Sequence, residues 1–177
     1  MESGKFSFKT PVMLLIFGLV IAAGINAQAN SSLNGRWAAV EDGVEVIYDF
    51  RNGNYEILIN EESFGMISLL KGTYTASDSE IVFNIDSIFG GFFKLLFEEI
   101  GIQTKIDEKW YSIEDFLVFF ISVFKDFGLS ESDIDEIVNE TIGELSTTIP
   151  YSLNGNTLIM KSPFTTDVNA ETVFTRR

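Results

Sequence analysis

The sequence predicts a mainly β protein, an antiparallel up-and-down β-barrel of about eight strands with an α-helical insertion at about residues 87–149 between late strands. Three observations favour this fold. Residues 36–86 alternate apolar and polar side chains with a period of two, which is typical of half-buried strands. Turn signals, of which Asn52-Gly53 is the strongest, separate the alternating runs. The alternation stops after residue 86 and returns at about residue 150.

The first alternating block places its apolar side chains on one face of successive strands. Beyond Asn52-Gly53, turn or end signals stand at Lys71-Gly72 and at Asp78-Ser79. The residues expected to face inward are Val44, Val46, Tyr48, Phe50, Tyr55, Ile57, Ile59, Phe64, Met66, Leu70, Tyr74, Ala76, Ile81, Phe83 and Ile85.

The last part of the chain repeats the strand pattern. Tyr151 and Leu153 lead into the hairpin signal Asn154-Gly155, and residues 158–160 and 172–176 alternate again. The eight or nine short strands would leave two exposed edges unless the sheet closes on itself, and eight strands close into a barrel that holds side chains or one small ligand. A β-sandwich is the alternative, because periodicity does not report closure.

Residues 87–149 have a helical pattern instead. Ser112 is the predicted N-cap of a helix at residues 112–127, with Asp115 at the position of the capping-box acid. Its apolar arc covers roughly 200°, which is too wide for one contact surface. Two further helices are expected at residues 91–100 and from Ser130 to about Leu145.

The N-terminus has the order of a bacterial secretory signal peptide. Lys5 and Lys9 precede an apolar run at residues 12–25, and Ala27-Gln28-Ala29 forms an A-x-A cleavage site. Fourteen helical residues would span only about 21 Å, which is short of a bilayer core. We therefore expect residues 1–29 to be a signal peptide and residues 30–177 to be one barrel domain, exported to the periplasm or the medium, without a transmembrane segment after cleavage. A retained anchor is the alternative.

The composition excludes many kinds of chemistry. The chain contains no cysteine and no histidine, so disulfides, thiolate nucleophiles, Cys/His zinc sites and imidazole bases are ruled out. The net charge of −14 repels phosphate backbones, so we expect no nucleic-acid partner. No pattern points to a metal or a cofactor.

Two acidic patterns are candidates for a hydrolase site and for a calcium site, and surface charge is the favoured interpretation of both. Glu61-Glu62 and Glu98-Glu99 would suit a carboxylate-based hydrolase, but the sequence places neither pair across a cleft. In the acidic run from Glu131 to Glu136, an EF-hand loop that begins at Asp133 would need glycine at its sixth position, where Val138 stands. An enzyme is therefore the third hypothesis, and no catalytic residue is assigned.

Several short motifs together resemble the small secreted bacterial lipocalin-like (calycin-type) domains. They are Gly35-Arg36-Trp37, Gly53-Asn54-Tyr55, Lys71-Gly72-Thr73-Tyr74-Thr75, residues 151–158 and Phe174-Thr175-Arg176. The resemblance implies that Gly35 and Trp37 begin the barrel and that Arg176, from the last strand, crosses the Trp37 indole in a cation–π contact. The next residue, Arg177, is expected to contribute almost nothing. The helical insertion has no counterpart in that family.

Two functions follow as hypotheses. The first is a non-enzymatic binding protein for a small apolar or amphipathic ligand, with the helical insertion covering the barrel mouth. Its expected ligand-binding residues are Tyr48, Tyr55, Tyr74, Phe83, Phe116, Phe120 and Phe124. The second is a structural or interaction protein of the cell envelope, whose barrel is filled by side chains and whose phenylalanine-rich insertion binds a partner or a second copy.

The predicted export has a direct test. If the signal peptide is removed after Ala29, the mature protein begins at Asn30. The intact mass of protein recovered from the cell envelope or the medium should correspond to residues 30–177. A full-length species embedded in the membrane would contradict the prediction.

Overall fold

The computed structural model describes residues 31–41, 43–62, 64–99, 103, 105–126, 128, 130, 132, 146–161 and 171–177. The predicted signal peptide and the predicted helix from Ser130 to Leu145 lie outside these residues, apart from Ser130 and Ser132. The elements are η1 (Ser31–Leu33), β1 (Gly35–Glu41), β2 (Val44–Arg51), β3 (Asn54–Glu61), β4 (Gly65–Ala76), β5 (Glu80–Phe89), α2 (Gly90–Glu99), β6 (Trp110–Ser112), α3 (Ile113–Asp126), β7 (Ser146–Asn154), β8 (Thr157–Lys161) and β9 (Glu171–Arg176).

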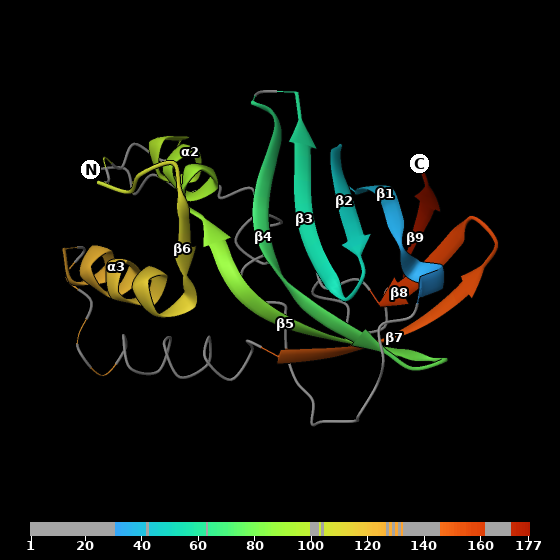
Figure 1. Cartoon of the computed structure of the whole chain (residues 1–177). Coiled ribbons are helices and arrows are strands. Elements are labelled where there is room, and N and C mark those ends of the chain that lie inside the picture. The colour runs from blue at the N-terminus through green and yellow to red at the C-terminus, as the bar shows by residue number, and fades with distance from the viewer. Residues whose placement is uncertain are drawn as a thin grey trace.

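Eight of these strands form a closed antiparallel β-barrel, so the predicted fold class is confirmed (Figure 1). Each strand from β1 to β5 pairs with the next strand along the chain, and β5 also pairs with β7. The last strand, β9, pairs with β1, which closes the barrel. The Asn52-Gly53 turn has positive φ at both positions, 50° and 84°, as its hairpin signal requires. The additional strand β6 pairs with the last residues of β5 and lies outside the barrel circuit.

Aromatic rings occupy the centre of the barrel. Tyr48 of β2 lies 5.8 Å from Phe83 of β5 and 5.3 Å from Phe174 of β9, measured between ring centroids. Phe50 stacks beside Tyr48 and meets the ring of Tyr74 edge-on at 4.8 Å. Because these rings come from strands on different sides of the barrel, their contacts hold its walls together.

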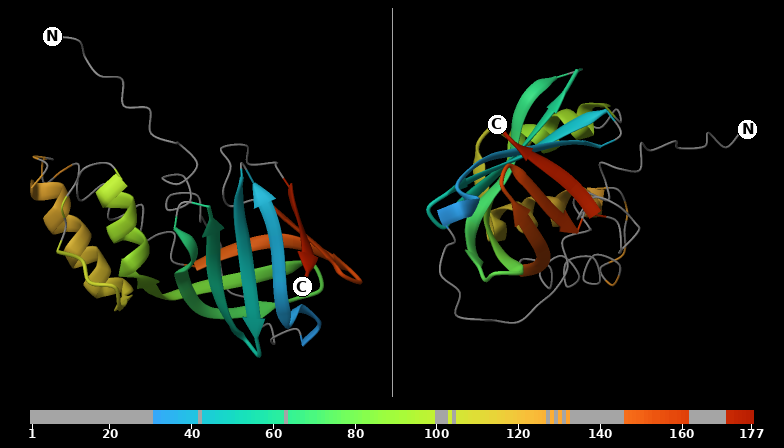
Figure 2. Two further views of the ribbon diagram at one scale, coloured as in Figure 1. Left: turned by 90° about the horizontal axis from the view of Figure 1, so that it is seen from above. Right: turned by 90° about the vertical axis from the view of Figure 1, so that its right-hand side faces the viewer.

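The insertion contains the two helices that the sequence predicts within its described part, and both lie to one side of the barrel, beyond the C-terminal end of β5 (Figures 1 and 2). The helix α2 packs against β4, and α3 packs against β5 and β6. Ser112 caps α3, because its hydroxyl accepts a hydrogen bond from the Asp115 amide at 3.1 Å. The insertion is slightly shorter than predicted, since β5 continues to Phe89 and β7 begins at Ser146.

A β-bulge in β4 corrects the predicted alternation. Ile57 pairs with Leu70 and Leu58 with Ser68, so Leu69 is an extra residue. The shift turns Met66 outward, where it is 51% exposed, although the sequence pattern predicts it to face inward. A second bulge lies in β5, where Asp86 is the extra residue opposite Lys71-Gly72, so Lys71-Gly72 lies within β4 and does not end a strand.

The first and last strands meet as the resemblance implies. Gly35 begins β1 with a φ of 122°, which favours glycine, and Trp37 is fully buried. The Arg176 guanidinium lies 4.5 Å from the centroid of the Trp37 ring. The expectation for Arg177 is not supported, since its guanidinium forms an ion pair with the nearly buried Glu45 and its amide donates to the Arg36 carbonyl at 2.9 Å.

Replacing Arg176 with alanine should lower the free energy of unfolding by about 1–2 kcal/mol, because the substitution removes the cation–π contact and uncovers the indole. The control is Lys161→Ala, a change at an exposed strand cation, which should cost less than about 0.5 kcal/mol. Urea denaturation measures both. Equal losses would show that the Arg176–Trp37 contact contributes nothing of its own.

Candidate functional site

Charged residues form a ladder across the outer face of β1 to β4. The strand register places Arg36 opposite Asp49, Asp49 opposite Glu56, and Glu56 opposite Lys71. In β3, Glu56 lies between the buried Tyr55 and Ile57, so Glu56 and the residues paired with it face away from the barrel axis. Antiparallel pairing of residues far apart in the sequence therefore gathers both signs of charge in one row.

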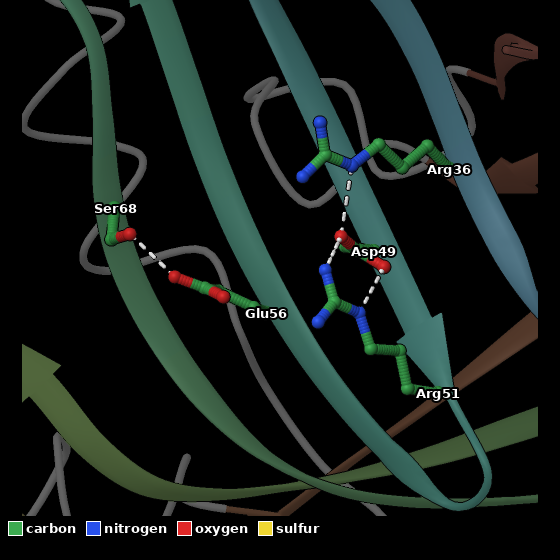
Figure 3. Close-up of polar contacts among 5 residues, drawn as sticks. All are labelled: Arg36, Asp49, Arg51, Glu56 and Ser68. Carbon is green, nitrogen blue, oxygen red and sulfur yellow. Dashed lines mark hydrogen bonds and ion pairs between the residues drawn. The ribbon is translucent and has the colours of Figure 1, made fainter.

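Asp49 is the most buried member of the ladder, with only 4% of its side chain exposed (Figure 3). Its carboxylate accepts hydrogen bonds from Arg36 Nε at 2.9 Å and from Arg51 Nη2 at 2.6 Å and Nε at 3.0 Å. The hydrogen bonds from Arg51 are the main reason that the pKa of Asp49 lies below its usual value, and they outweigh the opposing effect of burial. Asp49 is thus ionised, and the Arg51 guanidinium is engaged in hydrogen bonds with it.

The two other ladder residues have separate partners. Glu56 accepts a hydrogen bond from the Ser68 hydroxyl of β4 (Figure 3). The Lys71 ammonium lies 4.2 Å from the centroid of the Trp110 ring of β6, in a cation–π contact. Among the described residues, Glu56 forms no ion pair, although Arg51 is near enough to feel its charge.

Tyr55 lies beside the ladder and is 3% exposed. Its ring meets that of Phe83 edge-on, with centroids 4.8 Å apart. Its hydroxyl has no hydrogen-bond partner among the residues that the structure describes. Burial raises the pKa of Tyr55 well above its usual value, and the nearby negative charge of Asp86 raises it further. The phenol is therefore neutral and has unused hydrogen-bonding capacity.

The bulge between β4 and β5 places Asp86 beside these groups. Lys71 pairs with Ser87 and Gly72 with Ile85, so Asp86 has no partner across the strands. The strands approach so closely here that a Cβ on Gly72 would lie 1.9 Å from the Asn84 carbonyl oxygen. Only glycine fits at this position, and it allows the bulge to present an exposed carboxylate.

These elements surround an open hollow of about 350 Å³. Its lining comprises Asp49, Arg51, Asn54, Tyr55, Glu56, Lys71, Gly72 and Asp86. Three carboxylates and two cations give the lining a net charge of −1, and Tyr55 and Gly72, which pair across β3 and β4, complete it with Asn54. In the described part of the chain, no three acidic side chains are grouped as metal ligands. The arrangement suits reversible binding of a small polar or amphipathic molecule.

One of the predicted ligand-binding residues, Tyr55, lines this hollow. Tyr48, Tyr74 and Phe83 lie instead in the interior cluster, each no more than 2% exposed. The Tyr74 hydroxyl donates to the Asn34 side chain at 3.4 Å. These three residues pack against other rings of the barrel, which is the arrangement of a core.

The predicted residues on α3 form a second aromatic group. Phe116 lies 4.5 Å from Phe93 of α2 between ring centroids, and Phe120 lies 4.4 Å from Phe124. Phe116 and Phe120 belong to the same buried cluster as the barrel rings, and Phe124 packs against it. The contacts of Phe116 and Phe120 with Phe93 join α3 to α2, and the role of these residues in ligand binding stays a prediction.

Sequence reasoning missed Asp49, Arg51, Glu56, Lys71 and Asp86 as site residues. The sequence contains a signal for the pairing of two of them. A two-residue turn at Asn52-Gly53 fixes the strand register and so places Asp49 opposite Glu56. The bulge that presents Asp86 depends on how β4 pairs with β5 and leaves no local pattern.

Searches against known proteins found no matching family model, no matching curated protein and no matching solved structure. The lipocalin-like resemblance therefore stays a prediction that rests on the motifs of the sequence. Within the described residues, no helix combines the length and the apolar character needed to cross a membrane.

The paired Asp49 should make stability depend on pH at the acid end. Its pKa is lowered in the folded state, so its contribution is present above the unfolded value of about 3.9 and is lost as the pH falls through the folded pKa. Asp49→Asn should cost about 1–2 kcal/mol at pH 7 and progressively less below about pH 4. Urea denaturation from pH 3 to pH 7 tests this, and a cost independent of pH would contradict it.

Tyr55 should make stability depend on pH at the alkaline end. The pKa of its hydroxyl is raised in the folded state, so its contribution to the free energy of unfolding is present below the unfolded value of about 10 and is lost as the pH rises above that value. Tyr55→Phe should leave the protein at least as stable at pH 7, because the hydroxyl has no partner, and should reduce the alkaline loss of stability.

The matched control is Tyr151→Phe. The Tyr151 hydroxyl donates to the Ser77 carbonyl at 2.7 Å, so its removal should cost about 1 kcal/mol at pH 7. Thermal unfolding at pH 7 and pH 10.5 compares the two variants. A similar loss for both at pH 7 would mean that Tyr55 has a partner after all.

Proposed function

We propose that this protein is an exported, non-enzymatic, lipocalin-like binding protein for a small amphipathic ligand, and that the ligand occupies the hollow beside Tyr55. The observation that carries the proposal is the hollow of about 350 Å³, which charged side chains and Tyr55 line. Its volume falls within the range of roughly 300–1,000 Å³ that is typical of small-molecule sites.

The packing of the barrel supports a site in the wall over a site on the axis. Tyr48 contacts both Phe83 and Phe174 in the barrel interior, and each of the three is at most 1% exposed. A ligand at this level would have to displace rings that stabilise the fold. The hollow requires no such displacement, because it is already open to solvent.

The second candidate function is an interaction protein of the cell envelope, and the filled centre of the barrel also favours it. Two valines on the outer face of adjacent strands offer a small apolar surface, Val40 of β1 at 67% exposed and Val173 of β9 at 54%. Phe116 and Phe120 of α3, by contrast, contact Phe93 of α2, so the described part of the insertion offers less of a surface than the sequence interpretation expects.

The test of binding uses three probes with the same alkyl chain, namely octylamine, octanol and octanoate, below their micellar concentrations. At least one should shift the backbone amide signals of Gly72 and Asp86 in a titration followed by nuclear magnetic resonance. The variant Asn54→Trp should weaken that binding tenfold or more, because Asn54 lines the hollow and tryptophan would fill it.

Asn156→Trp is the matched control, since Asn156 also follows the glycine of an Asn-Gly hairpin turn but lies outside the lining. This variant should bind the probe like the unaltered protein. Failure of all three probes to move signals from the hollow, or equal affinity in both variants, would exclude the proposed site.

A further inference from the structure

We infer that Asn154 is a site of spontaneous deamidation, and that the fold protects Asn34 and Asn52, the two other asparagines that precede a glycine. In this reaction the main-chain nitrogen of the following residue gives up its proton and bonds to the side-chain amide carbon. The carbon–nitrogen bond of the amide breaks, ammonia leaves with that proton, and a five-membered succinimide ring remains. Water then opens the ring to aspartate or to isoaspartate. This site is separate from the proposed ligand site.

The side chains of Asn34 and Asn52 bind each other between the start of β1 and the turn from β2 to β3. Asn34 Oδ1 accepts a hydrogen bond from the Asn52 amide at 2.8 Å, and Asn34 Nδ2 donates to Asn52 Oδ1 at 3.0 Å. The Tyr74 hydroxyl also donates to Asn34 Oδ1, at 3.4 Å. Either side chain would have to turn its amide carbon toward the next main-chain nitrogen, which would break these hydrogen bonds. Both asparagines should therefore react slowly in the folded protein.

Asn154, the last residue of β7, has no such restraint. It is exposed, and its side chain forms no hydrogen bond within the described ranges. The attacking nitrogen would be that of Gly155, which is also exposed and donates to no described residue. A Cβ built on Gly155 would meet no atom within 4 Å, so the space around this nitrogen is open. The turn projects from the side of the barrel opposite α2 and α3 (Figures 1 and 2).

The main chain of the two hairpin turns is held in a similar way. The Tyr74 amide donates to the Gly53 carbonyl at 2.8 Å, and the Arg176 amide donates to the Asn156 carbonyl at 2.9 Å. A neighbouring strand thus anchors each turn. The difference between the turns lies in their side-chain amides, because that of Asn52 is held and that of Asn154 is not.

The product at residue 154 would alter the hairpin of β7 and β8. Isoaspartate carries the main chain through its Cβ atom and so adds one methylene group to the chain. The addition would fall at the last pair of the two strands, Asn154 with Thr157, next to the turn whose carbonyl receives the Arg176 amide. Because regular pairing fixes the register, the added group should loosen the hairpin where it meets β9.

Peptide mapping by mass spectrometry tests the inference on the full-length protein, incubated at pH 8.5 and 37 °C with and without guanidinium chloride. In the unfolded chain the three asparagines should react at rates within about threefold of one another, since each is followed by glycine. In the folded protein Asn154 should react at least tenfold faster than Asn34 or Asn52. Its products should include isoaspartate, which direct hydrolysis of the side chain does not give.

Asn34→Ala removes the partner of Asn52, so it should raise the rate at Asn52 at least threefold and leave the rate at Asn154 unchanged. Asn60→Ala is the control, because it removes a comparable hydrogen bond, from Asn60 to Glu45 at 3.0 Å, at another place on the barrel. This control should change neither rate. Folded protein in which Asn34 or Asn52 reacts as fast as Asn154 would overturn the inference. So would products at Asn154 without isoaspartate, or an unchanged rate at Asn52 in Asn34→Ala.

Discussion

The contact of aromatic rings across the barrel axis is the constraint on which the rest of the structure depends. Tyr48 joins Phe83 of β5 and Phe174 of β9, so a single side chain links three strands of a closed sheet. Since the chain has no cysteine, its stability depends on packing of this kind and not on disulfides. A centre filled by its own side chains also moves the candidate site from the axis to the wall.

The hollow in that wall arises where the regular sheet is interrupted. Gly72 permits a close approach that any side chain would block, and the extra residue Asp86 emerges beside the buried Tyr55. The charge ladder then determines which groups remain available, because Asp49 occupies Arg51 while Trp110 holds Lys71. Burial and register together therefore determine where the hollow lies and which charged groups line it.

The sequence predicts the barrel well because local rules govern its parts. Asn52-Gly53 specifies a two-residue turn, Ser112 specifies a helix start, and both act over a few residues. The bulges at Leu69 and Asp86 and the short strand β6 depend on tertiary pairing, so alternation alone does not report them. The same reason explains why Tyr55 was the one predicted residue that lines the hollow, while its charged neighbours were missed.

The central claim is that the ligand site lies in the hollow of the barrel wall and not on the barrel axis. The most direct measurement is of nuclear Overhauser effects between the protein and a bound octyl probe. The account predicts effects to the side chains of Asn54 and Asp86, which line the hollow. Effects confined to Phe116 and Phe120 of α3, or to Tyr48 at the barrel centre, would contradict it.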